Sequence, residues 1–567
     1  MHRMTRLPDG DPAAPLSEGG IRAPFDGRTF RFKGDEARME QANGARFVRL
    51  RSAASKDTDR LYRVTKVIGG RVREDFAGVE VASTAPAAPI IGDARAELIL
   101  PVSYVFATQS FRLKGYSVMV GERPGLRAGG VWNQTCIFCH NTVPYFDDLW
   151  GALHGPGAPS YQGEVVDRVL PEARRLRYSA TDPGALLRAL SDEVRVLAGD
   201  GAARGVLSGD GPDAPRAALA SAMREARARF EPRHFIELGI GCEACHGGSR
   251  AHADDPRLLP TFEPRAPFLA ATAADGGPSR PSAAEWQNRA CARCHQVLFS
   301  RYARTWEGGS RRSASDAGGS HITSGEARDF LLGGCAQAMT CSTCHDPHGG
   351  GTPERLARLA TPAGNGVCTG CHRELGTPSA LRAHAHHDPA GAAGSCVACH
   401  MPRKNMGLGY TLTRYHRIGS PTDAPRVERD RPLECALCHA NKTVAAVLDD
   451  IGRLWGKRYD RTAVARLYGS LEANVLTATI ERGWAHEQAA AMGSAGEQRW
   501  RPAAAAVARQ ATVNAYPLVR YTATAALAAI EGRPLPADIH GGGGDGTGVG
   551  RTSGSPTHSG TAPDDED

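Results

Sequence analysis

The stretch Cys341-Ser-Thr-Cys344-His345 is one of seven copies of a Cys-x-x-Cys-His pattern in this 567-residue chain. Two thiols three positions apart can both bond the vinyl groups on one edge of a porphyrin, and the histidine that follows can then ligate the iron. The pattern therefore indicates covalent attachment of seven c-type haems. The cysteines that attach them are Cys136, Cys139, Cys242, Cys245, Cys291, Cys294, Cys341, Cys344, Cys368, Cys371, Cys396, Cys399, Cys435 and Cys438.

Each copy ends in the histidine expected to bind its own iron from the proximal side. These residues are His140, His246, His295, His345, His372, His400 and His439. Structural zinc is the alternative, but zinc sites normally combine two Cys-x-x-Cys pairs on one ion, and an odd number of pairs fits that poorly. A disulfide framework fits less well still, because such frameworks belong to short secreted chains.

Composition is consistent with a haem-filled interior. Aromatic residues make up only 6% of the chain, and porphyrins would supply the missing apolar mass. The formal charge of +7 omits the haem propionates, so it is a poor guide to partners. The chain has no basic run with interleaved aromatics that would favour nucleic acid, and no apolar run of membrane-spanning length.

We expect an α+β protein with four parts. Residues 1–115 form a small β-rich N-terminal domain, and residues 116–445 form a mainly α multihaem domain with long loops and a helical insert at 161–230. Residues 446–535 form a helical bundle that resembles HEAT-type repeats, and residues 536–567, rich in Gly, Ser, Thr and Asp, form a disordered tail.

Local patterns support these divisions. Partial alternation of apolar residues predicts strands at 29–32, 46–50 and 61–68, with a hairpin turn at Gly69-Gly70. Apolar residues at helical spacing predict helices inside the insert and in the C-terminal part. These helices are at 184–198, 214–230, 444–455, 502–510 and 518–530, and a Gly/Asp-rich linker is expected at 199–213.

A second axial ligand for each iron must come from outside its motif. Ten further histidines lie in or near the haem region, more than the seven irons require, so every haem could have two imidazole ligands. The candidates are His2, His154, His234, His252, His321, His348, His384, His386, His387 and His416.

Three stretches resemble the multihaem cytochrome c superfamily, which includes pentahaem nitrite reductase, hydroxylamine oxidoreductase, octahaem tetrathionate reductase and tetrahaem carriers. They are Cys-Glu-Ala-Cys-His-Gly-Gly-Ser-Arg-Ala-His at 242–252, Cys-His-Asp-Pro-His at 344–348 and Cys-His-Met-Pro at 399–402. The resemblance implies distal ligation by His252, His348, His416 and one of His384, His386 or His387. It supports His234 and His321 less directly.

The start of the chain carries a further resemblance. Met1-His2-Arg3-Met4-Thr5 is similar to the segment that follows the first haem motif in large members of this group, where a histidine serves as an axial ligand. This implies that His2 is such a ligand. It also predicts that an eighth Cys-x-x-Cys-His and a signal peptide precede Met1, since residues 1–20 contain no apolar signal segment.

One departure from the group bears on function. Nitrite and tetrathionate reductases of this type replace one proximal histidine by lysine, and no Cys-x-x-Cys-Lys occurs here. We therefore expect electron transfer in a respiratory chain, with other cytochromes or a quinol-linked donor as partners, in the periplasm or another extracytoplasmic space. The alternative is an oxidoreductase that acts on a small nitrogen or sulfur compound at one open haem. The C-terminal helices could also dock a partner, and Cys335, the one cysteine outside the motifs, is either a buried side chain or a thiol near a haem.

Overall fold

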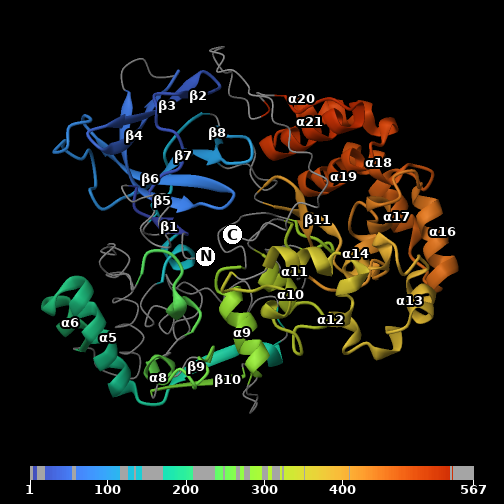
Figure 1. The fold of residues 1–567 in the computed structure, drawn as a ribbon, viewed down its shortest axis with the longest axis horizontal. Helices are drawn as coiled ribbons and strands as arrows, with labels where there is room; N and C mark the ends of the chain where they lie inside the picture. Colours follow the sequence, from blue (N-terminus) through green and yellow to red (C-terminus); the bar gives the residue numbers. More distant parts are fainter. Residues whose placement is uncertain are drawn as a thin grey trace.

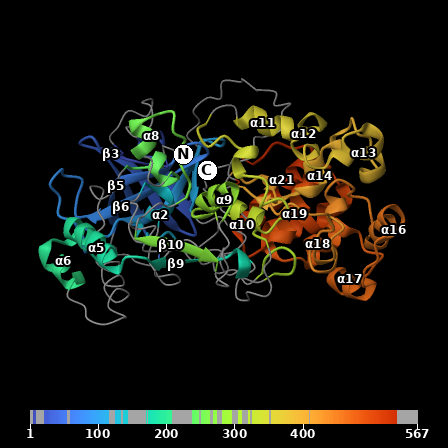
Figure 2. The same cartoon turned by 90° about the horizontal axis from the view of Figure 1, so that it is seen from below.

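The computed structural model describes residues 4–8, 20–53, 59–114, 125–132, 136–142, 170, 172–207, 237–246, 250–263, 268–273, 281–295, 304–309, 319–321, 325–349, 352–407, 409–536 and 539. A β-sheet lies at one side of the molecule and the C-terminal helices at the other, with the haem-motif segments spread between them (Figure 1). The same order along the long axis is visible from below (Figure 2). The expected α+β class is confirmed.

The N-terminal sheet has eight antiparallel strands. Seven follow the order β2-β3-β4-β5-β6-β7-β8, and β1 pairs with β5 beside this path. The expectation of a β-rich N-terminal part is confirmed. The strands are β1 Thr5–Arg6, β2 Thr29–Phe32, β3 Asp35–Ala42, β4 Ala45–Arg51, β5 Arg60–Gly69, β6 Arg73–Val81, β7 Leu98–Val105 and β8 Ser110–Leu113.

The expected hairpin turn joins β5 to β6. Gly69 and Gly70 both have positive φ, at 82° and 147°, a backbone conformation that residues with a Cβ rarely adopt. Alternate residues of the strands point into one core, where Phe25 meets Phe76 edge-on with ring centroids 5.4 Å apart. Glycine at the turn and alternation along the strands together determine this part of the fold.

A buried ion pair attaches β1 to the sheet. Arg6 Nη2 lies 2.6 Å from Glu74 Oε1, and the two side chains are 2% and 0% exposed. The same carboxylate accepts hydrogen bonds from the backbone N–H groups of Arg22 and Ala23. Glu74 therefore joins three chain segments at one point.

The segment 161–230 is only partly helical where it is described. Helix α5, Pro183–Ala198, matches the prediction, with Asp182 capping its first turn through the Ala185 N–H. The predicted linker was wrong over residues 200–207, because the chain continues there as α6, Asp200–Leu207. Small Ala203 lets α6 pack on α5, where Ser191 Oγ donates to its carbonyl. Strand β9, Leu176–Ala180, pairs with β10, Leu269–Ala273, outside the insert, and the helix expected at 214–230 lies outside the described residues.

Short helices and one hairpin carry the haem motifs and the loops between them. From α8 to α13 they run toward the C-terminal helices, and α14 and β11 then turn back toward the centre (Figure 1). The elements are α2 Ile137–His140, α8 Arg250–Asp254, α9 Ala283–Ala292, α10 Glu326–Leu331, α11 Thr352–Leu359, α12 Gly366–Thr369, α13 Pro378–Ala385, α14 Cys396–His400, β11 Arg403–Met406, β12 Leu412–Arg414 and α15 Ala424–Glu428.

Six α-helices follow the last motif in the part of the chain that the structure describes. They are α16 Val444–Trp455, α17 Arg461–Tyr468, α18 Val475–Arg482, α19 Ala485–Glu497, α20 Ala504–Val513 and α21 Pro517–Glu531. Helix α19 packs closely against two neighbouring elements at its glycines. A Cβ added at Gly493 would lie 2.8 Å from Leu412 of β12, and one added at Gly496 would lie 2.9 Å from Ala526 of α21. Similarity to HEAT repeats stays a prediction.

One hydrophobic core crosses residue 445, the expected domain boundary. It joins Tyr415 and Leu433 from the haem-motif region to Val447, Val507 and Val519 of the C-terminal helices. Among the described residues, no helix is both long and apolar enough to cross a bilayer. Nearly all of the tail expected at 536–567 lies outside them.

The Arg6–Glu74 pair generates a stability prediction. Glu74→Ala leaves the Arg6 guanidinium buried without its counter-charge, which typically costs about 3–5 kcal/mol of unfolding free energy. Asp26→Ala serves as the control, since Asp26 and its partner Arg28 are 54% and 42% exposed and such pairs contribute at most about 1 kcal/mol. Urea unfolding followed by circular dichroism measures both. Equal losses in the two variants would contradict the role assigned to Glu74.

Candidate haem-binding sites

All seven Cys-x-x-Cys-His motifs fold as a single helical turn. In six of them the first cysteine's carbonyl accepts the N–H groups of the second cysteine and of the histidine, at 2.9–3.3 Å. The remaining motif, the sixth along the chain, is helix α14 itself. Residues three and four positions apart lie on one face of such a turn, so both thiols and the imidazole project to the same side.

This geometry fits a porphyrin better than a zinc ion. The motif residues are all described, and among the described residues no group of three or more His, Cys, Asp or Glu side chains converges as a metal cluster would. Each turn instead offers two sulfurs and one ring nitrogen. That is the donor set of covalently attached haem.

Four proximal histidines face a second imidazole ring across a gap. The rings of each pair are inclined by 13–35° to each other, and their centroids lie 5.9–6.3 Å apart. The pairs are His246–His348, His345–His416, His384–His400 and His387–His439. In every pair, the histidine that lies outside the motif was a predicted distal candidate.

The separation within these pairs has a simple interpretation. A metal that binds two imidazoles lies about 2 Å from each nitrogen, and each nitrogen lies about 1.1 Å from its ring centre, giving a centroid separation of about 6 Å. Two rings in direct stacking contact lie closer. His321 shows that case, because its centroid lies 4.4 Å from that of His486.

The remaining distal candidates have different surroundings. His321 contacts His486, a residue outside the predicted set, and burial lowers the pKa of both rings. His386 packs edge-on against Trp455 at 5.0 Å, and His252 Nδ1 contacts the Leu258 carbonyl at 2.5 Å. His2, His154 and His234 lie outside the described residues.

The N-terminal sheet supports the first motif. Thr5 Oγ1 donates to the His140 carbonyl at 2.8 Å, so strand β1 contacts this motif directly. Burial, with the nearby Lys114 ammonium, lowers the pKa of His140 to about 4. A ring held neutral in this way keeps the form that binds iron.

His295 is held by a carboxylate, a contact that the motif pattern does not indicate. Its Nδ1 lies 3.0 Å from Glu326 Oε2, at the start of α10. In the sixth motif, by contrast, His400 Nδ1 lies 2.9 Å from a backbone carbonyl, that of Gly419. Glu326 is distant from His295 in sequence, so no local signal could have identified it.

Cys335 lies near the thiols of the fifth motif, Cys368 and Cys371, and burial raises its pKa. A thiol held protonated is a weak nucleophile and a weak metal ligand. The structure thus places Cys335 beside a haem motif while keeping it in its less reactive form.

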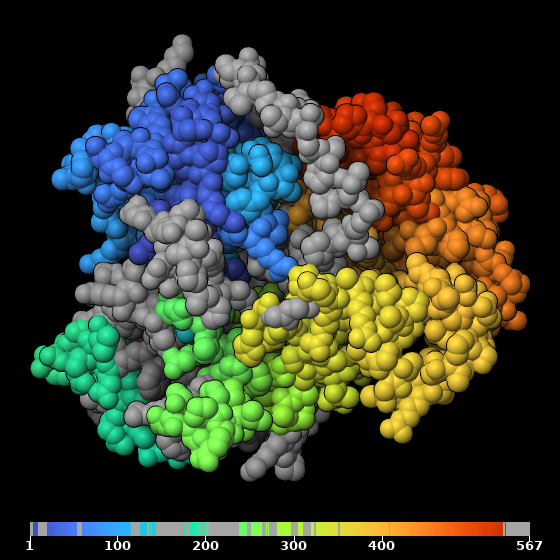
Figure 3. Space-filling view, viewed as in Figure 1, coloured from blue at the N-terminus to red at the C-terminus, as the bar shows by residue number. Residues whose placement is uncertain are grey.

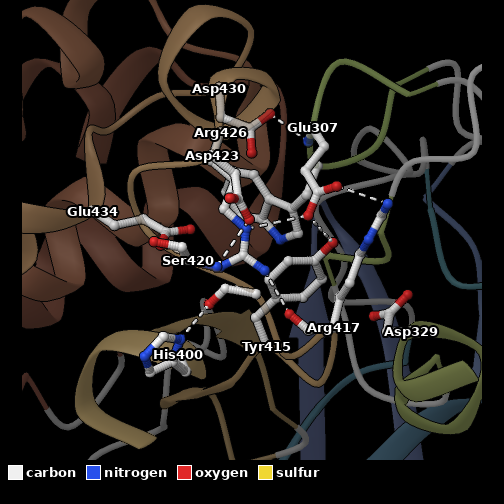
Figure 4. A network of polar contacts seen from close by, with 12 residues as sticks. Glu307, Asp329, His400, Tyr415, Arg417, Ser420, Asp423, Arg426, Asp430 and Glu434 are labelled. Carbon is white, nitrogen blue, oxygen red and sulfur yellow. Dashed lines mark hydrogen bonds and ion pairs between the residues drawn. The ribbon is translucent and has the colours of Figure 1, made fainter. Parts of the chain in front are cut away.

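A buried network of charges lies behind the sixth and seventh motifs (Figure 4). Lys404 Nζ lies 2.7 Å from Glu434 and 3.2 Å from Asp430, and Arg426 lies 3.3 Å from both Glu434 and Glu307. Sequence patterns did not reveal it, because its members come from three separate segments. The network joins the loop before the seventh motif to the β11–β12 hairpin.

Asp430 has an altered pKa within this network. Burial is the largest cause and outweighs the attraction of Lys404, and the nearby carboxylates of Glu487, Glu307 and Glu434 act in the same direction as burial. Together they raise the pKa of Asp430 from 3.8 to about 7.

Comparison with known proteins agrees with the motif geometry. A family model described as "Doubled CXXCH motif" matches residues 334–377, which contain the fourth and fifth motifs. The chain has multihaem c-type cytochrome character. No curated protein and no solved structure matches the chain.

Asp430 generates a pH prediction. The folded chain holds the proton up to about pH 7, whereas the unfolded chain releases it near pH 3.8. The proton on Asp430 therefore makes its full contribution to the free energy of unfolding below pH 3.8. This contribution falls by at most about 1.4 kcal/mol per pH unit as the pH rises from 3.8 to about 7. Asp430→Asn should flatten the measured stability over this range. The exposed control Asp449→Asn should keep the wild-type slope, and an unchanged slope in Asp430→Asn would contradict the assignment.

Proposed function

We propose that this protein is an electron carrier that holds seven haem c groups in a connected, branched arrangement. The observation that carries the proposal is the set of four histidine pairs at 5.9–6.3 Å. Bound haem c supplies a one-electron iron couple. Two imidazoles on one iron leave no open position, so such a site favours electron transfer over catalysis.

The pairs assign four distal ligands. His348 serves the second motif, His416 the fourth, His384 the sixth and His387 the seventh. The proximal residues His140, His295 and His372 then take their partners from His2, His154, His234 and His252, which are enough for three irons.

Contacts between motifs support a branched electron path. Thiols of different motifs lie close together in three places, and these sulfurs would become the thioether sulfurs of neighbouring haems. The close pairs are Cys139 with Cys294, Cys291 with Cys341, and Cys368 with Cys396. These contacts connect the first motif to the third, the third to the fourth, and the fifth to the sixth.

Two further contacts complete the path. His416, the ring opposite His345, lies three residues before Gly419, whose carbonyl contacts His400, so the fourth motif adjoins the sixth. Cys399 of the sixth motif lies close to Cys438 of the seventh. The main line then runs through motifs one, three, four, six and seven. Motif two branches from the fourth, since His348 follows His345 in one loop, and motif five branches from the sixth.

The setting follows from the chemistry of attachment. Covalent haem attachment takes place outside the cytoplasmic membrane, so we place the protein in the periplasm or an equivalent space, in a respiratory chain. Its partners are then other cytochromes or a quinol-linked donor. On the face shown in Figure 3, the sheet (blue) and the last helices (red) lie above, and the motif segments (green to yellow) lie below them.

Two measurements on the matured wild-type protein test the proposal. Intact mass should exceed that of the bare polypeptide by seven haems, and the reduced protein should not bind carbon monoxide. A lower mass would contradict the haem count. Binding of carbon monoxide would show an open iron and favour the alternative, an oxidoreductase for a small nitrogen or sulfur compound.

The three neighbouring histidines of α13 and its end test the ligand assignment. His384→Ala and His387→Ala should each convert one haem to a high-spin form that binds carbon monoxide, because each removes one distal ring. His386→Ala is the matched control, since its ring packs on Trp455 and faces no proximal histidine. Visible spectra with carbon monoxide decide between these outcomes. A high-spin haem in His386→Ala, or none in the other two variants, would overturn the assignment.

A further inference from the structure

We propose that Glu326 makes His295 a more strongly electron-donating proximal ligand than a histidine with a neutral partner, and so lowers the reduction potential of the haem of the third motif. This inference rests on the proposed function and identifies a residue that regulates it. The contact between His295 Nδ1 and Glu326 Oε2, at 3.0 Å, is its starting point.

The direction of the effect follows from the charge. When the ring binds iron through Nε2, Nδ1 carries the proton and donates it in a hydrogen bond to the carboxylate. The negative charge draws that proton away from the ring and gives the imidazole more anionic character. An anionic ligand stabilises ferric over ferrous iron, which lowers the reduction potential.

The surroundings of the His295–Glu326 contact make it stronger than the corresponding contacts of His372 and His400. The Glu326 side chain is only 14% exposed, so water screens its charge poorly. His372 and Glu374 in the fifth motif form a similar pair, but at 3.6 Å and with side chains 59% and 69% exposed. His400 has only a neutral backbone carbonyl opposite its Nδ1.

Contacts other than the one with the His295 ring also hold Glu326 in place. The Arg328 N–H donates to the His295 carbonyl at 3.2 Å, so α10 contacts the third motif through backbone as well as side chain. Ala327, Phe330 and Leu331 of the same helix pack in a small core with Ala292 and Cys291. A carboxylate fixed in this way acts on the ring without reorganisation.

The position of the third motif determines how a lower reduction potential there would affect the distribution of electrons. Cys294 contacts the first motif and Cys291 contacts the fourth, so the third haem lies between the N-terminal part of the path and the rest. With a low reduction potential, the third haem transfers electrons but is seldom in the reduced state at equilibrium. Electrons would then distribute on either side of it.

Redox titration of the holoprotein tests the inference. Glu326→Gln keeps the shape and the hydrogen-bond acceptor but removes the charge, so one haem equivalent in seven should move to higher potential while the other six stay. Glu374→Gln is the matched control and should leave the titration curve unchanged. The resonance Raman spectrum should also change for one haem only in Glu326→Gln, which a general loosening of the structure would not produce.

The possible outcomes separate this inference from the proposed function. No shift in Glu326→Gln, or equal shifts in both variants, would overturn the role of Glu326 even if seven haems and insensitivity to carbon monoxide hold. If Glu326→Gln fails to mature, Glu326→Asp decides. Its carboxylate reaches less far, so a smaller rise in one haem's potential supports the inference, and an unchanged titration overturns it.

Discussion

Four haem motifs each bring their own histidine opposite a second histidine from elsewhere in the chain, and these pairings join distant segments of the molecule. The second ring comes from a different segment in all four pairs that the structure shows. His348 reaches the second motif from the loop of the fourth, and His384 and His387 reach two motifs from a single helix end. Each such pair brings distant parts of the chain together at one haem motif.

Packing of the polypeptide also holds the haem-motif region in place at its N-terminal and C-terminal ends. On one side the sheet brings Thr5 and Lys114 to the first motif. On the other, a core and a charge network centred on Lys404 fix the loop before the last motif against α19 and its neighbours. The short motif turns have little core of their own, so these two blocks and the haems together supply the order that local structure lacks.

Much of the fold could be predicted from local patterns. Strand alternation and the glycine pair at 69–70 indicated the sheet, and helical spacing indicated α5, α16, α20 and α21. The prediction of a linker after Ala198 was wrong, because the glycines and aspartates of 199–213 are also compatible with a short helix supported by a neighbour. Amino-acid composition alone does not show that α5 packs against this helix.

The sequence by itself determined the chemistry: each motif carries both sulfurs and the proximal nitrogen within five residues, so a single helical turn arranges them whatever surrounds it. Only the tertiary structure decided which second histidine faces which motif, that His321 instead stacks on His486, and that Glu326 contacts His295. The physical reason is the distance along the chain over which each feature is determined. Covalent attachment depends on spacing along the chain, whereas distal ligation and tuning depend on side chains that meet only after distant segments have packed together.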